Sequence, residues 1–179
     1  MNVEWKKEIK LSPELQAMIR NSGDKRGTGM AIAKEMDKQN ELTVNAIQGK
    51  LSGPLLRVRR GHLRESISRT DAIVVADNDS TEVRATVGSN ARFGGDSLAY
   101  AAPLEFGSKP HLIRPLPGRG PKASLRFIGR NGQVCFAKAV NHPGNRPYNY
   151  VRGTVEERLA IYRDRIGGAA YTFITGGTN

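Results

Sequence analysis

The sequence predicts an α+β fold, in which an antiparallel β-sheet of about four strands packs with N-terminal helices and a C-terminal helix. Three observations lead to this prediction. Helix signals occupy residues 12–48, two pairs of strand-like segments follow within residues 67–137, and helical spacing returns over residues 148–166. The chain has 179 residues, a length that suits one domain with extended terminal arms.

The first part of the chain carries the signals of two helices. Ser12-Pro13-Glu14 combines an N-cap residue, a proline at the first helical position and an acid near the positive end of the helix dipole. This helix is predicted to end at Asn21-Ser22-Gly23. A second helix is predicted from about Thr28 to about Gln48. Because Asn40 interrupts its apolar stripe, we expect this helix to lie across a sheet or a neighbouring subunit.

Two hairpins supply the predicted sheet. Residues 67–76 are rich in β-branched side chains, and residues 82–87 alternate polar and apolar as a half-buried strand does. Residues 124–128 and 133–137 form the second pair. They flank Asn131-Gly132, which favours a two-residue type I′ turn with positive φ at both positions.

The last helix is predicted over residues 148–166, with one apolar face formed by Val151, Val155, Leu159, Tyr162 and Ile166. Gly167-Gly168 is predicted to stop it. We therefore divide the chain into an N-terminal arm with a short helix (1–26), a single α+β domain (27–166) and a C-terminal arm (167–179). Both arms are rich in glycine or only weakly amphipathic, so neither is expected to be ordered by itself. We therefore expect a partner or a sister subunit to hold them.

The composition excludes several classes of protein. The chain is 38% hydrophobic and 25% charged, which is typical of a globular protein rather than a disordered one. A single cysteine, Cys135, excludes an internal disulfide framework and a cysteine-based zinc site. The longest apolar runs fall far short of the roughly 20 residues that a membrane span needs. No secretory signal is visible, so we expect a protein that is made in a reducing cytoplasm and does not contact a membrane.

The positive charge is concentrated in one stretch of the chain. Overall, 28 Lys and Arg stand against 17 Asp and Glu, which gives a net charge of +11. Between Phe106 and Val155 there is no acidic residue, and the nine basic residues there, which we call the basic field, are Lys109, Arg114, Arg119, Lys122, Arg126, Arg130, Lys138, Arg146 and Arg152. A field of one sign attracts nucleic acid or an acidic protein surface. The alternative is a solvated basic face that aids solubility.

Catalytic and metal-binding patterns are missing from the sequence. His62, His111 and His142 lie in unrelated segments without carboxylates or cysteines at ligand spacing. No phosphate-binding glycine motif occurs, and nothing around Ser66 resembles a nucleophile elbow. Cys135 lies mid-strand, where a small buried thiol is expected. We therefore expect no enzymatic activity, no cofactor and no metal.

The usual elements that read nucleic-acid sequence are missing as well. The chain has no zinc-finger spacing, no basic helix that leads into heptads and no aromatic-rich strand of the RNA-binding kind. The basic field is interleaved with proline and glycine. It therefore suits contact with backbone phosphates, or with an acidic partner ring, better than base-specific recognition.

Three segments of the chain have a recognisable pattern: residues 55–67 (LLRVRRGHLRESI), 100–108 (YAAPLEFGS) and 142–152 (HPGNRPYNYVR). In this order they resemble the tail-completion and virion-morphogenesis proteins of long-tailed bacteriophages, the head–tail joining and minor tail proteins. The chain departs from that family at Arg60 and Ser108, where threonine is usual, and at residues 148–150, which replace a proline-phenylalanine pair.

The resemblance marks twelve positions, most of which we expect to be core and turn residues: Val58, Gly61, Leu63, Ser66, Ile67, Tyr100, Glu105, Phe106, Gly107, Pro143, Gly144 and Pro147. Leu63 and Ile67 stand four residues apart, so both side chains can pack on one side of a turn that Gly61 begins.

The resemblance implies a structural protein of a tailed phage virion, located at the neck or proximal tail and assembled in the cytoplasm of the bacterial host. It implies a homo-oligomeric ring, six-fold to match tail symmetry, through which the genome passes. The implied partners are other neck and tail proteins: a connector or stopper, the tail terminator and the tail tube. The basic field is then expected either to contact genomic DNA in the lumen or to face an acidic surface within residues 71–105 of the adjacent subunit. Two alternatives stay open: a tail terminator that caps the tail tube, and a basic nucleic-acid-binding accessory protein.

Overall fold

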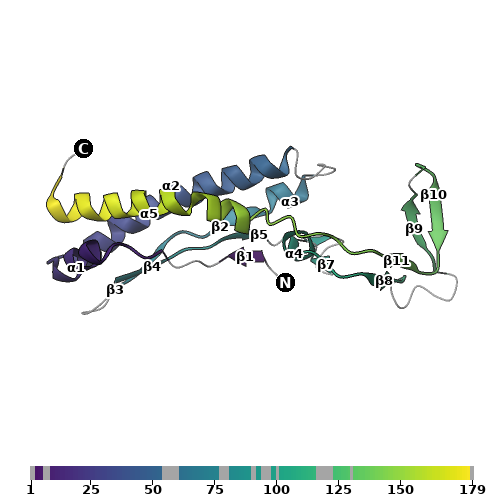
Figure 1. The fold of residues 1–179 in the computed structure, drawn as a ribbon, viewed down its shortest axis with the longest axis horizontal. Coiled ribbons are helices and arrows are strands. Elements are labelled where there is room, and N and C mark those ends of the chain that lie inside the picture. The colour runs from purple at the N-terminus through teal and green to yellow at the C-terminus, as the bar shows by residue number, and fades with distance from the viewer. Residues whose placement is uncertain are drawn as a thin grey trace.

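The computed structural model has the predicted α+β fold. It describes residues 3–5, 9–53, 61–76, 81–89, 92–93, 98–99, 101–115, 123–129 and 131–177. Helices and small sheets form an elongated body, and a slender extension of strands projects from one end of it (Figure 1).

Two long helices run side by side along the body: α2 (Lys25–Leu51) and α5 (Arg152–Thr175) (Figure 1). The short helix α1 (Pro13–Asn21) packs against α5. It begins where the sequence predicts, because the Ser12 hydroxyl accepts a hydrogen bond from the Leu15 amide at 3.2 Å. Asp24 caps α2 in the same way, through the Gly27 amide at 2.7 Å.

Below the long helices lie the strands of the body (Figure 1). Their bounds are β1 (Val3–Trp5), β2 (Ile67–Arg69), β3 (Ile73–Ala76), β4 (Thr81–Arg84) and β5 (Val87–Ser89). β1, β5 and β2 form an antiparallel sheet with β5 in the middle, and β3 pairs with β4. The N-terminal strand of the predicted arm is therefore part of a sheet of its own chain.

The first predicted hairpin is present, but it is interrupted halfway. Arg69 pairs with Val87 and Ile73 with Arg84, so Asp71 and Ala72 stand opposite Ala85 alone. Such a two-against-one arrangement is a β-bulge, which leaves one residue without its ladder partner. Here the Ala72 amide donates instead to the Asp37 carboxylate of α2 at 2.9 Å, which ties the bulge to the helix.

The remaining elements lead from the body into the extension. These are α3 (His62–Glu65), β6 (Arg92–Phe93), β7 (Leu98–Ala99), α4 (Ala101–Phe106), β8 (His111–Ile113), β9 (Leu125–Ile128), β10 (Val134–Ala137) and β11 (Val140–His142). β9 and β10 form the second predicted hairpin, and β8 pairs with β11. The two hairpins do not join into one four-stranded sheet, because β9–β10 stands at the end of the extension and β3–β4 lies under α2 (Figure 1).

The buried apolar side chains form two clusters in the body. The first cluster joins the end of α2 to the small sheet, α4 and the start of α5: Ile47, Leu51, Ile67, Val87, Ala101, Ala102, Tyr150 and Val151. The second cluster joins α2 to the later turns of α5: Ile32, Tyr162, Ile166 and Ala170. Both clusters lie in the body, so the extension contributes no buried cluster among the described residues.

The predicted end of the last helix is wrong. α5 continues through Gly167 and Gly168 as far as Thr175, and Gly176 ends it with a left-handed φ of +66°. A glycine inside a helix costs only about 1 kcal/mol. Beyond these two glycines, Ala170 is fully buried in the second core cluster, and this packing outweighs the cost. Most of the predicted C-terminal arm is therefore helix.

A basic arm as the candidate interaction site

The extension is the most distinctive surface of the molecule. We call residues 107–149 the arm. Two antiparallel ribbons build its described part: β8–β11, nearer the body, and β9–β10, at the far end (Figure 1). Because this whole stretch lies within the acid-free part of the sequence, the arm carries positive charge only.

A short backbone bridge holds the base of the arm together. The Ser108 and Asn145 amides donate to one another's carbonyls at 3.0 and 3.1 Å. Gly107 and Gly144 lie next to this bridge with φ of +79° and +84°. A Cβ at Gly144 would collide with the Ser108 carbonyl oxygen, so only glycine fits there.

Glu105 connects the base of the arm to the last helix. Its side chain is 1% exposed, and its two carboxylate oxygens accept hydrogen bonds from the Val151 and Arg152 amides at 2.9 and 2.8 Å. These amides are at the start of α5, where free N–H groups and the helix dipole favour a negative charge. The buried carboxylate therefore serves as the cap of α5.

The three segments that resemble the phage family meet around the first core cluster. Ile67 is buried in this cluster, and Leu63 packs against it from α3. Gly61 starts α3 with a φ of +77°, and the Ser66 hydroxyl lies 2.6 Å from that of Ser89. In the structure, these four residues lie in the core and in the turn that leads into β2.

The second and third segments meet at the base of the arm. Glu105 and Gly107 come from one segment and Gly144 from the other, and the Leu104 carbonyl accepts a hydrogen bond from the Tyr148 amide at 2.9 Å. The remaining positions that the resemblance marks in these segments, and Val58 of the first segment, are not among the core residues that the structure describes. Phe106, Pro143 and Pro147 are exposed, whereas Val58 and Tyr100 lie outside the described residues.

The basic field divides between the arm and the body. Five of its described residues are exposed on the arm: Lys109, Arg114, Arg126, Lys138 and Arg146. Arg152 instead belongs to α5, where its guanidinium pairs with Glu156 at 3.0 Å, so it is separate from the arm. Arg119, Lys122 and Arg130 lie outside the described residues.

The β9–β10 hairpin exposes large apolar side chains, which sequence reasoning missed. Ile128 and Phe136 are each 67% exposed, and Phe127 and Val134 are also exposed. The sequence does carry a signal for this exposure. Apolar residues occupy both faces of both strands, which is typical of strands that are covered on two sides, and here it would have indicated a contact surface. Within the described part of the chain, these four side chains stay exposed on the hairpin.

The turn of this hairpin differs from the predicted type. Gly132 has a φ of +81°, but Asn131 does not have positive φ. The Gly132 amide donates to the Gly129 carbonyl at 3.0 Å, and the Gly129 amide donates to the Gln133 carbonyl at 2.8 Å. The loop thus has three residues and ends in a left-handed glycine, as three-residue hairpin loops commonly do. Cys135 on β10 is half-buried rather than buried.

Two of the three histidines lie together, contrary to the sequence interpretation. His111 and His142 are directly opposite in the β8–β11 ribbon, with ring centroids 5.0 Å apart. His142 Nδ1 accepts a hydrogen bond from the Gly144 amide at 3.0 Å, which links this ring to the base of the arm. Within the described residues no three histidine, cysteine or acidic side chains are arranged to hold a metal ion.

A buried polar cluster joins α2 to α5 and explains why Asn40 interrupts the apolar stripe. The Tyr162 hydroxyl donates to Asn40 Oδ1 at 2.7 Å and lies 2.8 Å from the Thr43 hydroxyl, which accepts from Arg158 Nε at 2.9 Å. Burial raises the pKa of Tyr162, while the Thr43 hydrogen bond and the Arg158 charge act in the other direction. Because these groups satisfy one another, the cluster fixes the register of the two helices.

The comparisons with known proteins give no relative. No family model, no curated protein and no solved structure matches the chain. None of the helices in the described part of the chain is both long and apolar enough to cross a membrane. The arm combines positive charge with an exposed apolar hairpin, and this combination makes it the candidate interaction site.

Proposed function

We propose that this chain is a structural subunit of a tailed bacteriophage virion, which acts at the neck or proximal tail and assembles into a ring. The observation that carries the proposal is the arm. Two strands on their own are marginally stable in water, and this hairpin exposes four large apolar side chains at its tip. Contact with another protein surface would cover them, and a subunit of a larger assembly provides such contact.

The base of the arm supports the same proposal. The Ser108–Asn145 bridge and the two glycines beside it fix the start of the arm, and Glu105 ties that region to the long helix α5. A hinge or a flexible linker would not need this set of specific contacts. An arm that is fixed to a body suits a subunit whose role is to hold a neighbour in one geometry.

The choice of a phage particle comes from the resemblance of the three sequence segments. Two of them form the base of the arm and the third lies in the adjoining core, so the resemblance concerns the part of the molecule that positions the arm. We infer a six-fold ring that matches tail symmetry, with the connector or stopper, the tail terminator and the tail tube as further partners. We propose no catalytic role.

The experiment is deletion of the gene for this chain from the genome that carries it, in a strain that produces phage particles. The proposal predicts that heads and tails accumulate separately, and that the supplied protein restores joined, infectious particles. In particles that contain the protein, antibodies against it should label the head–tail joint. Label at the distal end of isolated tail tubes would favour the alternative of a tail terminator. Infectious particles that lack the protein would contradict a structural role in the virion.

The acid-free arm favours a second candidate, a nucleic-acid-binding accessory protein. Such a protein would bind duplex DNA as a small particle, and its affinity would fall steeply with salt because each phosphate contact releases counterions. A ring-forming subunit should instead be a large multimer in the absence of DNA. Sedimentation with and without duplex, at two salt concentrations, distinguishes the two candidates.

A further inference from the structure

We infer that the β9–β10 hairpin of one subunit docks on the outer face of the β3–β4 hairpin of a second copy of this chain. This inference rests on the proposed ring and names the surfaces that would form its subunit contact.

The donor surface is one face of the β9–β10 hairpin. The register pairs Arg126 with Phe136 and Ile128 with Val134, so these four side chains share a face. All four are exposed. The face therefore offers three large apolar groups beside one guanidinium, and no acidic group occurs anywhere on the arm.

The acceptor surface is the outer face of the β3–β4 hairpin. Val74 and Thr81 face α2, where Gly29 leaves room for them, and the alternate residues face outward. Ile73 and Val75 on this outer face are 64% and 49% exposed. Their cross-strand partners are Arg84 and Glu82, so the acceptor also combines apolar side chains with charged ones.

Carboxylates border this acceptor surface. Arg69 is bound by three of them, Asp37, Glu41 and Asp71, at 3.3, 3.4 and 2.7 Å, which leaves a net negative spot beside the start of β3. The Asp71 side chain is 90% exposed. Glu82 lies on the acceptor face itself, but Arg84 of the same face pairs with it at 2.6 Å, so the excess negative charge lies at the border and not on the face. The positive arm and this bordered apolar face are therefore complementary in charge as well as in hydrophobicity.

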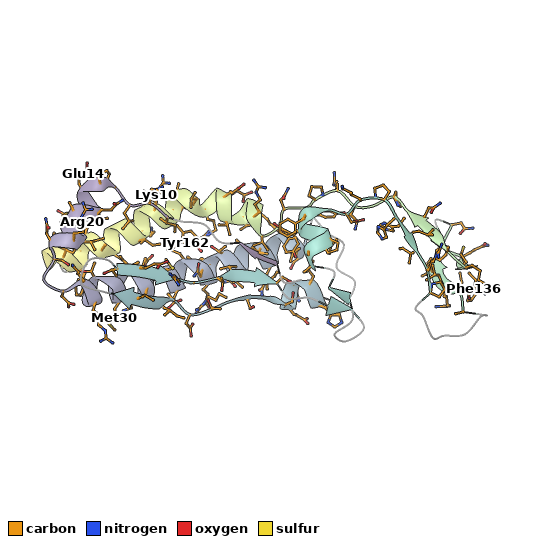
Figure 2. All side chains as sticks on the ribbon, turned by 90° about the horizontal axis from the view of Figure 1, so that it is seen from below. Lys10, Glu14, Arg20, Met30, Phe136 and Tyr162 are labelled. Atoms are coloured by element: carbon orange, nitrogen blue, oxygen red, sulfur yellow. The ribbon has the colours of Figure 1, made fainter. Side chains whose placement is uncertain are left out.

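The positions of the two surfaces require two molecules. β3–β4 lies under the end of the body farthest from the arm (Figure 1), and Figure 2 shows Phe136 and Met30 at opposite ends of the elongated molecule. A single chain cannot bring its own hairpin to its own acceptor face. Each surface is a two-stranded sheet with four residues per strand, so their dimensions match. A head-to-tail contact of this kind closes into a ring when its rotation closes.

Two variants test the contact, one for each surface. The arm variant carries Ile128→Asp and Phe136→Asp, and the face variant carries Ile73→Asp and Val75→Asp. Each variant alone should be monomeric by native mass spectrometry. An equal mixture should contain heterodimers and nothing larger, because only one intact arm and one intact face remain. Ile161→Asp, at an exposed position of α5, is the control that should assemble like the wild type.

Disulfide cross-linking tests the contact without charged substitutions. In a Cys135→Ser background, Phe136→Cys combined with Val75→Cys should give a ladder of linked chains after oxidation. Phe136→Cys combined with Ile161→Cys should give none. Circular dichroism checks that every variant has kept its fold.

The outcomes separate this inference from the proposed function. A face variant that still forms the wild-type multimer would overturn the inference and leave the ring intact. The predicted heterodimers, combined with particles that never contain the protein, would support the contact and overturn the phage role. A wild-type chain that stays monomeric would overturn the inference, because the contact is between copies of this chain.

Discussion

At the scale of single residues, the buried groups of this protein act as structural partners. Glu105 caps α5, and Tyr162, Asn40 and Thr43 hold α2 against α5. The resemblance marked Glu105, but its partners could not be predicted because they lie 46 and 47 residues away in the sequence. The sequence shows Asn40 only as an interruption of the apolar stripe, and the structure supplies its partner, the Tyr162 hydroxyl.

Replacement of Glu105 by alanine should destabilise the protein by about 1–3 kcal/mol, because two amides at the start of α5 lose their acceptor in a buried place. Glu105→Gln keeps one acceptor oxygen and should cost less. The control is Glu157→Ala, which removes an exposed ion pair with Lys50 and should change stability by less than about 1 kcal/mol. Urea unfolding measures all three. Equal stability of Glu105→Ala and Glu157→Ala would contradict the capping role.

Tyr162→Phe should cost about 1–3 kcal/mol at neutral pH, because Asn40 loses its hydroxyl partner in a buried site. It should also change the alkaline profile. The folded-state pKa of Tyr162 lies above the ordinary value of 10.0, so the folded chain binds this proton more tightly than the unfolded chain. The corresponding stability is complete below pH 10 and is lost as the pH rises through the folded-state pKa.

The comparison of unfolding at neutral and alkaline pH isolates this contribution. Tyr171→Phe, an exposed position on the same helix, is the control and should follow the wild type. Tyr162→Phe should lose less stability than the wild type above pH 10. Parallel alkaline profiles of the wild type and Tyr162→Phe would show that burial of this hydroxyl does not affect its titration.

At the scale of elements, the sequence predicts what local signals determine. The N-cap at Ser12 begins α1, and Gly132 shapes the turn of the second hairpin. The interruption at Asp71 and the extension of α5 beyond Gly168 depend on packing against α2 and the second core cluster. No local pattern records that packing, so these features could not be predicted.

Gly144→Ala should destabilise the base of the arm by more than about 1 kcal/mol, because the residue has positive φ and its Cβ would collide with the Ser108 carbonyl oxygen. Gly153→Ala is the matched control: the nearest contact to its Cβ is 3.8 Å away, and the position is helical. It should be neutral or stabilising by up to about 1 kcal/mol. Thermal unfolding distinguishes the two, and a stable Gly144→Ala would contradict the fixed geometry of this joint.

Gly168→Ala tests the continuation of α5. A Cβ at this position meets nothing within 4 Å, and the residue lies inside the helix. Alanine should therefore stabilise the protein by about 0.5–1 kcal/mol. If the helix stopped here with a left-handed glycine, as the sequence suggested, the same substitution would be destabilising in a thermal melt.

At the scale of the whole molecule, the acid-free stretch of the sequence coincides with the extension that projects from the elongated body (Figure 1). The sequence shows an acid-free stretch that suits either an interaction surface or a solvated basic face, and most of this stretch forms the arm. The exposed apolar groups at its end were not predicted, because exposure depends on which strands are covered in three dimensions. Positive charge and exposed apolar area occur together on the arm, which is why we propose a protein contact there.

The central claim is that these subunits assemble through their arms, and the mass of the purified wild-type protein tests it most directly. Native mass spectrometry across a range of concentrations should show one discrete multiple of the 19.6 kDa chain, and electron microscopy of the same sample should show closed rings with an open centre. A monomer at every concentration at which the protein stays folded would contradict the account.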